Sequence, residues 1–236
     1  MKIPFPALAA VAAGGYFYAV YRSGRSGLHP LSKPKAGQVR VACVGDSITY
    51  GHGTTSWPKH TYPAVLHKLL GPGYHVNNYG FNGKSVNPDC PDAYCVTKLF
   101  TQSLEYDADI VVFMMGTNDA KPRNWRGEEA FRADLETLLE CYHRAEIILC
   151  TPAAAFMKDG VTGDLAEYEI QPAKVEAAAR VIRQVAQERG CTLVDIHTLT
   201  ADKPYCYICD RIHPGNTGAE MIAQAVAAAV QRRETK

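Results

Sequence analysis

A serine that directly follows a short apolar run is the first side chain with clear chemical potential. The run covers 39–44 and leads into Gly-Asp-Ser-Ile-Thr at 45–49. Valine favours a buried β-strand and glycine permits a tight turn, so Ser47 is predicted at the end of a strand with its hydroxyl accessible. A hydroxyl in this position can act as a nucleophile if a base takes its proton.

A histidine near the end of the chain has the neighbours of a general base. His213 follows Asp210 by three residues, and this carboxylate could reach the ring nitrogen that faces away from the serine. Pro214 disfavours helical backbone at His213, which predicts that the pair lies in a loop before the last helix. Asp195 and His197 are an alternative pair, but side chains at positions i and i+2 of a strand end have little reason to bond to each other.

Four short blocks of residues, in this order, resemble the motifs of the SGNH hydrolases, also called the GDSL esterase/lipase family. The blocks are Gly-Asp-Ser-Ile at 45–48, the glycine Gly83, Gly-Thr-Asn-Asp at 116–119 and Asp-Arg-Ile-His at 210–213. The resemblance covers about 38–232, nearly the whole chain after its N-terminal segment. It implies a serine esterase that needs neither a metal nor an organic cofactor.

The resemblance also implies roles for individual residues. The catalytic residues would be Ser47, His213 and Asp210, and the oxyanion hole would consist of the backbone N–H groups of Ser47 and Gly83 and the side-chain amide of Asn118. Glycine suits position 83 because a side chain there could block the acyl oxygen, although Gly80 is a competing candidate. Asp46 and Asp119 are expected to fix loops by accepting hydrogen bonds rather than to transfer protons.

The loops expected around the serine are polar and carry isolated aromatic residues, as at 53–58 and 121–125. His52, Trp57 and Trp125 are therefore candidates for lining a substrate site, since flat rings beside hydrogen-bonding groups suit a sugar. No loop after the strands offers a long apolar run to shelter a fatty chain, which favours short acyl groups, in particular acetyl esters of carbohydrates. The alternatives are a lysophospholipase or lipase, a thioesterase, an acyltransferase with the same machinery, and a non-catalytic domain that binds a small ligand.

Apolar runs alternate with amphipathic patterns, which predicts an α/β fold with a parallel sheet covered by helices on both faces. The predicted strands are 39–44, 74–79, 109–115, 146–151 and 191–196. The predicted helices are 62–70, 128–144, 172–189 and a last helix opened by a capping box at 217–220. The resemblance implies the three-layer α/β/α, flavodoxin-like form of this fold, with a five-stranded sheet in the order 2-1-3-4-5. In that sheet each motif block follows a strand, so all four blocks meet at one edge.

The composition is that of a single globular domain. The chain has 236 residues, 47% of them hydrophobic, and a formal net charge of +1. This balance gives no electrostatic reason to expect a nucleic acid or another strongly anionic partner. The hydrolase domain is predicted at 38–236, after a linker at 23–37 that carries Gly, Ser, Pro and Lys.

The segment 1–22 is predicted to be a membrane anchor or an export signal. Residues 3–21 carry no charge and are just long enough to span a bilayer as a helix, and the Ala-Val-Ala at 10–12 resembles a signal cleavage site. A location on the extracytoplasmic side is favoured on this ground. Basic residues follow the segment, however, and under the positive-inside rule they would keep an anchored domain facing the cytoplasm.

The chain has eight cysteines, a high number. Those in predicted strands and helices, at positions 43, 141, 150 and 191, are expected to be small buried hydrophobic residues. Cys90 with Cys95 and Cys206 with Cys209 could form local disulfides outside the cytosol. A single Cys-x-x-Cys without a second pair is poor evidence for a zinc site.

Overall fold

The structure is a computed structural model that describes residues 31–232. The segment 1–22, predicted to be an anchor or signal, lies outside the described residues, as does the first part of the predicted linker. Within the described range, no helix is both long and apolar enough to cross a membrane. All four motif blocks lie within this range.

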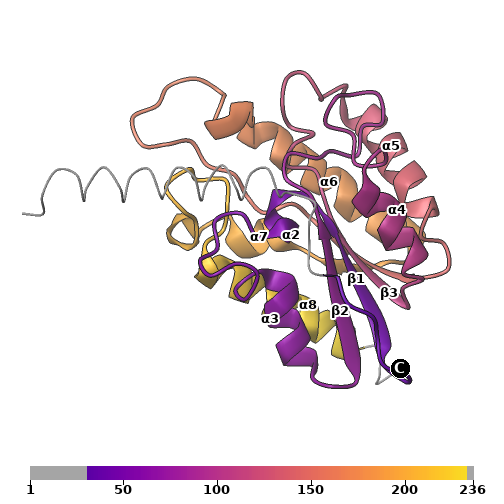
Figure 1. The fold of residues 1–236 in the computed structure, drawn as a ribbon. Helices are drawn as coiled ribbons and strands as arrows, with labels where there is room; N and C mark the ends of the chain where they lie inside the picture. The colour runs from indigo at the N-terminus through magenta and orange to yellow at the C-terminus, as the bar shows by residue number, and fades with distance from the viewer. Residues whose placement is uncertain (1–30, 233–236) are drawn as a thin grey trace, which may run out of the picture.

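Five parallel strands form one sheet in the order β2-β1-β3-β4-β5, which confirms the predicted fold class and strand order. Figure 1 labels the first three strands of this order, with β1 between β2 and β3. The strands are β1 (Val39–Gly45), β2 (Tyr74–Gly80), β3 (Ile110–Met114), β4 (Glu146–Cys150) and β5 (Thr192–Val194). β5 is shorter than predicted because Asp195 accepts a hydrogen bond from the backbone N–H of Thr198 and so caps a short helix, α7 (Ile196–Thr200). The strand order reverses between β1 and β3, and ligands of such sheets bind beyond the strand ends at this point.

Helices cover both faces of the sheet. One face carries α3 (Tyr62–Leu70) and α8 (Asn216–Gln231), and the other carries α4 (Lys98–Glu105), α5 (Glu128–Glu140) and α6 (Pro172–Arg189) (Figure 1). The bounds of α3 and α6 agree with the prediction, whereas α5 ends four residues before its predicted end at position 144. The sequence pattern does not predict α4, which begins after Thr97, whose side chain accepts a hydrogen bond from the backbone N–H of Phe100.

The start of α8 differs from the prediction. Its N-cap is Gly215, which makes no side-chain cap hydrogen bond, so Thr217 lies inside the helix and the predicted capping box is not formed. Asn216 instead bonds to the loop after the serine. Its Oδ1 accepts a hydrogen bond from the backbone N–H of Thr55 at 2.9 Å, and its Nδ2 donates to the Thr55 hydroxyl at 2.7 Å. These bonds connect the first residue of α8 to the loop that follows the serine.

Alternate residues of the central strands face two separate apolar cores. In β1, Val41 and Cys43 pack in the core shared with α3 and α8, whereas Ala42 and Val44 pack in the core shared with α4, α5 and α6. All four residues are fully buried. Because both faces are covered, the strand shows a continuous apolar run instead of an alternating pattern. The two cores hold the ends of β1 and β3 rigidly at the edge where the motif blocks lie.

The described part of the predicted linker lies against the edge strand β2. The hydroxyl oxygen of Ser32 is 2.8 Å from Nε2 of His75, and its backbone N–H donates to Oδ1 of Asn77 at 3.2 Å. Asn77 returns a hydrogen bond of 3.1 Å from its amide to the carbonyl of Ser32. Leu31 packs against the core shared with α4, α5 and α6. Residues from 31 onward are therefore part of the packed domain, which extends beyond the predicted boundary at 38.

All eight cysteines are free thiols, so neither local disulfide suggested by the sequence is formed. Cys90 lies with its sulfur 3.0 Å from the hydroxyl of Ser85, and Cys206 is buried beneath the start of α8. Among the cysteines expected to be buried, those at 43 and 150 are buried, that at 191 is half-buried, and that at 141 is exposed.

Candidate active site

The serine lies at the junction of a strand and a short helix. Ser47 is the first residue of α2 (Ser47–Tyr50), which begins two residues after the end of β1. Asp46 is the N-cap, and its Oδ1 accepts a hydrogen bond from the backbone N–H of Ile48 at 2.9 Å. β1 can approach the helix this closely because Gly45 has no side chain, since a Cβ there would lie 2.1 Å from the hydroxyl oxygen of Thr49. The turn fixes the serine side chain at the carboxyl edge of the sheet.

The histidine and aspartate lie in the loop before α8, as predicted. Nε2 of His213 is 2.8 Å from Oγ of Ser47, and Nδ1 of His213 is 2.7 Å from Oδ2 of Asp210. Oδ1 of Asp210 accepts hydrogen bonds from the backbone N–H groups of Ile212 and His213, both at 2.9 Å. Burial alone would raise the pKa of Asp210, but the hydrogen bond and charge of His213 and these backbone donors outweigh it and hold that pKa below its usual value. The carboxylate is thus kept ionised against the ring it orients.

The expected oxyanion donors line the same cavity as the serine, a cavity of about 310 Å³. Nδ2 of Asn118 donates to the carbonyl of Lys84 at 3.1 Å, which fixes the amide and leaves its second N–H for another acceptor. Gly83 has a φ of +77°, a conformation that side chains disfavour. A Cβ at this position would meet no protein atom within 4 Å, so backbone conformation rather than crowding by the protein explains the glycine.

Gly80, the competing candidate, has a different role. It is the last residue of β2 and pairs with the last residue of β1. A Cβ at Gly80 would lie 2.1 Å from the backbone nitrogen of Tyr50, so the glycine allows β2 to pack directly against α2. It is not among the residues that line the cavity, which favours Gly83 as the oxyanion donor.

Two further buried carboxyls are next in sequence to residues that line the cavity. Asp119 accepts a hydrogen bond from the backbone N–H of Val86 at 3.0 Å, and Asp46 caps α2, so both fix loops as expected. Both are at most 2% exposed. Burial raises the pKa of Asp46 to about 6 and that of Asp119 to about 7, against the partial compensation of their backbone hydrogen bonds.

One of the three expected lining residues reaches the cavity. His52 does so, with its ring centroid 4.3 Å from that of His213. Trp57 does not, because its Nε1 donates to the carbonyl of Tyr50 at 2.9 Å and its ring stacks on that of Tyr50. Trp125 also lies elsewhere, stacked on Phe131 at the edge of an apolar core. Both tryptophans are therefore used in packing rather than at the site.

The alternative aspartate–histidine pair is not formed. Asp195 accepts hydrogen bonds from Nε and Nη2 of Arg183, at 2.9 Å and 3.0 Å, and from the hydroxyl of Thr151 at 3.0 Å. The backbone N–H of His197 donates to the same threonine hydroxyl at 2.8 Å. Asp195 is thus a structural residue that joins α6 to the end of β5.

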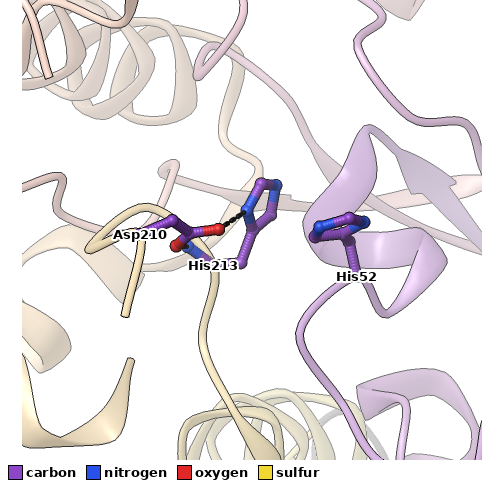
Figure 2. Close-up of side chains that lie close together, drawn as sticks. All are labelled: His52, Asp210 and His213. Carbon is purple, nitrogen blue, oxygen red and sulfur yellow. Dashed lines mark hydrogen bonds and ion pairs between the residues drawn. The ribbon is translucent and has the colours of Figure 1, made fainter. Parts of the chain in front are cut away.

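Three side chains could in principle hold a metal ion. Figure 2 shows His213 between Asp210 and His52, and each residue offers a ligand atom within 4.8 Å of the other two. Both oxygens of Asp210 already accept hydrogen bonds, and one of them bonds to Nδ1 of His213. Both ring nitrogens of His213 already have partners, Nδ1 at Asp210 and Nε2 at Ser47, so an ion ligated by this histidine would displace one of these two contacts.

Sequence reasoning misses six residues that line the cavity. They are Asn82, Thr117, Lys121, Tyr168, Ile170 and Ile212. Tyr168 and Ile170 belong to the connection between β4 and α6, which has no strand and only one short 3₁₀ turn, Glu167–Glu169. Long connections of this kind in a compact domain are often functional. The length of this one is the signal that could have pointed to them.

The chain belongs to the GDSL-like lipase/acylhydrolase family, also called the SGNH hydrolases, whose family model matches residues 43–221. Members of this class are ester-bond hydrolases. The match includes the serine block, the glycine and the asparagine block, and it extends through the aspartate and histidine of the last block.

Similar proteins include named esterases. An acetylxylan esterase of Xylanibacter ruminicola is 31% identical over 226 residues, an alignment that covers 86% of this chain and 45% of that protein. The chain therefore spans about half the length of this curated relative. A solved carbohydrate acetylesterase family member from Sinorhizobium meliloti has a TM-score of 0.70 and 23% identity, covering 83% of this chain and 98% of that one. The aryl esterase of M. smegmatis has a TM-score of 0.66 and 20% identity, covering 82% and 99%. These two structures bear on the fold alone.

Proposed function

We propose that this protein is a serine esterase that removes short acyl groups, in particular acetyl groups, from carbohydrates. The observation that carries the proposal is the chain of close contacts from Asp210 through His213 to Ser47, beside a cavity that Gly83 and Asn118 also line. Membership of a family of ester-bond hydrolases supports the same conclusion. The role of each residue is inferred from these contacts and from general catalytic chemistry.

In the first half of the reaction, Oγ of Ser47 attacks the ester carbonyl while Nε2 of His213 takes the hydroxyl proton. Asp210 holds Nδ1–H and stabilises the imidazolium that forms. The backbone N–H groups of Ser47 and Gly83 and the amide of Asn118 receive the negative charge on the acyl oxygen. His213 then gives its proton to the alcohol oxygen as the bond between this oxygen and the acyl carbon breaks, so the alcohol leaves and the acyl group stays on Oγ of Ser47. In the second half, His213 takes a proton from water as the water attacks the acyl carbon, and it returns this proton to Oγ as the bond between Oγ and the acyl carbon breaks, which releases the acid.

The size of the cavity supports a short acyl group. At about 310 Å³ it lies at the lower end of the range for small-molecule sites, and its lining mixes polar and apolar side chains. A long acyl chain gains its binding energy from continuous apolar surface, at about 0.8 kcal/mol per methylene. The name of the acetylxylan esterase relative supports both an acetyl group and a carbohydrate.

Release of acetate from acetylated xylo-oligosaccharides tests the proposal. We expect the protein to release acetate from them, to hydrolyse acetyl esters faster than octanoyl or palmitoyl esters, and to be labelled at Ser47 by a fluorophosphonate. A ten-fold preference for long-chain or lysophospholipid substrates would replace the proposal with a lipase role. Transfer of the acyl group to a sugar hydroxyl in place of hydrolysis would indicate an acyltransferase, and a lack of labelling would indicate a binding domain.

A further inference from the structure

We propose that Tyr168 forms a binding subsite for the alcohol half of the substrate, where its ring packs against a sugar. The inference rests on the proposed function and adds the residue that selects the alcohol. The ring of Tyr168 lies edge-on to that of His213, with centroids 5.4 Å apart and an interplanar angle of 72°. Tyr168 lines the cavity and is 51% exposed. Accessible aromatic surface thus lies directly beside the histidine that handles the leaving group.

The backbone at Tyr168 has a conformation that tyrosine rarely adopts. Tyr168 has φ 58° and ψ 25°, and Glu169 has φ 62°. The backbone N–H of Ile170 donates to the carbonyl of Glu167 at 3.2 Å, which closes a four-residue turn around these two positions. Turns with two positive φ angles usually carry Asn, Asp or Gly, so tyrosine and glutamate strain this one. Strain of this kind persists where the surrounding structure enforces it, and it is concentrated at functional sites.

The surrounding structure does enforce this turn. Ile170 is buried and packs in a small apolar cluster with Ala120 and Ile212. The backbone N–H of Gln171 donates to the carbonyl of Ala120 at 3.2 Å. Ala120 directly follows the asparagine block, and Ile212 directly precedes the histidine. The turn is therefore fixed to both sides of the site, and the Tyr168 ring is fixed with it.

The reaction itself determines which half of the substrate meets Tyr168. His213 must donate a proton to the alcohol oxygen, so this oxygen comes within hydrogen-bond distance of Nε2. The rest of the alcohol then lies beside the imidazole, whose ring neighbours are His52 and Tyr168. The acyl oxygen instead faces the N–H donors at Gly83 and Asn118. The aromatic surface of Tyr168 therefore contacts the alcohol, and the acyl group lies on the side of the cavity that Gly83 and Asn118 line.

A sugar is the alcohol that this surface suits. One face of a sugar ring carries C–H groups that pack against an aromatic ring, while its hydroxyl groups stay in contact with water or polar side chains. Because Tyr168 is half exposed, the sugar can extend from the cavity into solvent, as a residue within a longer carbohydrate chain must.

Two substitutions separate a binding role from a structural one. Asparagine tolerates a positive φ, so Tyr168→Asn removes the ring and relieves the turn, whereas Tyr168→Phe keeps the ring. For Tyr168→Asn we expect kcat/KM on an acetylated xylo-oligosaccharide to fall roughly five- to ten-fold, mainly through KM. For ethyl acetate, kcat/KM should stay nearly the same, so the ratio of kcat/KM for the oligosaccharide to kcat/KM for ethyl acetate should fall by a similar factor. The Tm of the variant should stay equal or rise. Tyr168→Phe should keep the original ratio.

Tyr205→Ala is the matched control, because Tyr205 is 72% exposed and lies outside the cavity lining. It should change neither the ratio nor the activity. An unchanged ratio in active Tyr168→Asn would overturn the subsite alone. A lower Tm with equal losses of kcat on both esters would also overturn it, by showing that the ring only supports His213. If the unaltered protein hydrolyses ethyl acetate but releases no acetate from the sugar, the carbohydrate assignment and the subsite fail together.

Discussion

The hydroxyl oxygen of Ser47 and the Nε2 atom of His213 lie 2.8 Å apart, although the two residues are 166 positions apart in the chain. The position of the serine is fixed by the end of β1 and the start of α2. The position of the histidine is fixed by its bonds to Asp210. The two atoms are close enough for direct proton transfer from the serine to the histidine.

Ser47→Ala should lower turnover by on the order of 10³-fold or more, because the nucleophile is lost while the oxyanion donors remain. Ester hydrolysis and labelling by a fluorophosphonate, followed by intact-mass measurement, check this result. Circular dichroism should show an unchanged fold, since the substitution removes one hydroxyl at the edge of the sheet. Near-normal hydrolysis by the folded variant would mean that another residue is the nucleophile.

Asp210→Asn should lower kcat by roughly 10⁴-fold, because an amide would donate to Nδ1 of His213 and favour the wrong tautomer of the ring. Asp195→Asn is the matched control. Asp195 bonds to Arg183 and does not contact the site, so its replacement should lower Tm and leave kcat near its original value. Comparison of kcat and Tm for the two variants separates the roles. The reverse pattern would restore Asp195 and His197 as the catalytic pair.

Asn118→Ala should lower kcat by roughly 10²–10³-fold with little change in KM, because its amide acts on the charge that develops in the transition state. The loss of its bond to Lys84 makes a fold control necessary, and Tm serves for that purpose. Steady-state kinetics with an acetyl ester distinguish the two parameters. A large rise in KM at unchanged kcat would instead make Asn118 a residue that binds the ground-state substrate.

Asp119→Asn should change how stability depends on pH. The pKa of Asp119 is raised by burial to about 7, so its stabilising contribution is complete below about pH 4 and is lost as the pH rises toward 7. Asparagine is neutral throughout and can still accept the bond from Val86. The variant should therefore gain stability relative to the original protein between pH 4 and 7, as measured by urea unfolding.

Asp92→Asn is the control for this titration. Burial opposes ionisation of Asp92, but hydrogen bonds from Asn124 and Arg123 and the charge of Lys121 hold its pKa below the usual value. Ionised Asp92 stabilises the fold above about pH 4, and this stabilisation is lost as the pH falls. Asp92→Asn should therefore lose stability relative to the original protein as the pH rises, which is the opposite of the change expected for Asp119→Asn. Parallel pH profiles for the original protein and Asp119→Asn would contradict the raised pKa.

A chain that begins at Leu31 should be folded and active, because all four motif blocks and the contacts of Ser32 are retained. A chain that begins at Lys35 loses the bonds of Ser32 to His75 and Asn77 and the packing of Leu31, so its Tm should be lower by several degrees. Thermal unfolding of the two chains checks the difference. Equal Tm values would show that residues 31–34 contribute nothing to the domain.

Most of the fold could be predicted from the sequence because its elements have simple patterns. β3 is buried on both faces, and α6 has an apolar stripe that begins after a proline, so their approximate positions are evident without a structure. The start of α8 is predicted wrongly because Asn216 bonds to Thr55, 161 residues away, and no local pattern reports that contact.

The residues of the site also include some that the sequence predicts and some that it does not. Ser47, His213 and Asp210 could be predicted because each lies in a short motif beside a strand or helix end. The length of the connection between β4 and α6 indicates a functional segment but does not single out Tyr168, because two positive φ angles at tyrosine and glutamate run against the usual composition of turns. The expectation for Trp57 and Trp125 fails because a large aromatic ring in a polar loop packs as readily on a neighbouring ring as on a ligand.

The long separation between serine and histidine also governs when activity arises during synthesis. The serine block leaves the ribosome early, whereas the histidine and the helix α8, which completes one of the two cores, leave it among the last parts of the domain. A nascent chain that stops before position 210 carries the nucleophile but no base, and one core lacks one of the two helices that cover it. Ester hydrolysis should therefore appear only when the domain is complete, and a chain degraded from its C-terminal end should lose activity before it loses the serine motif.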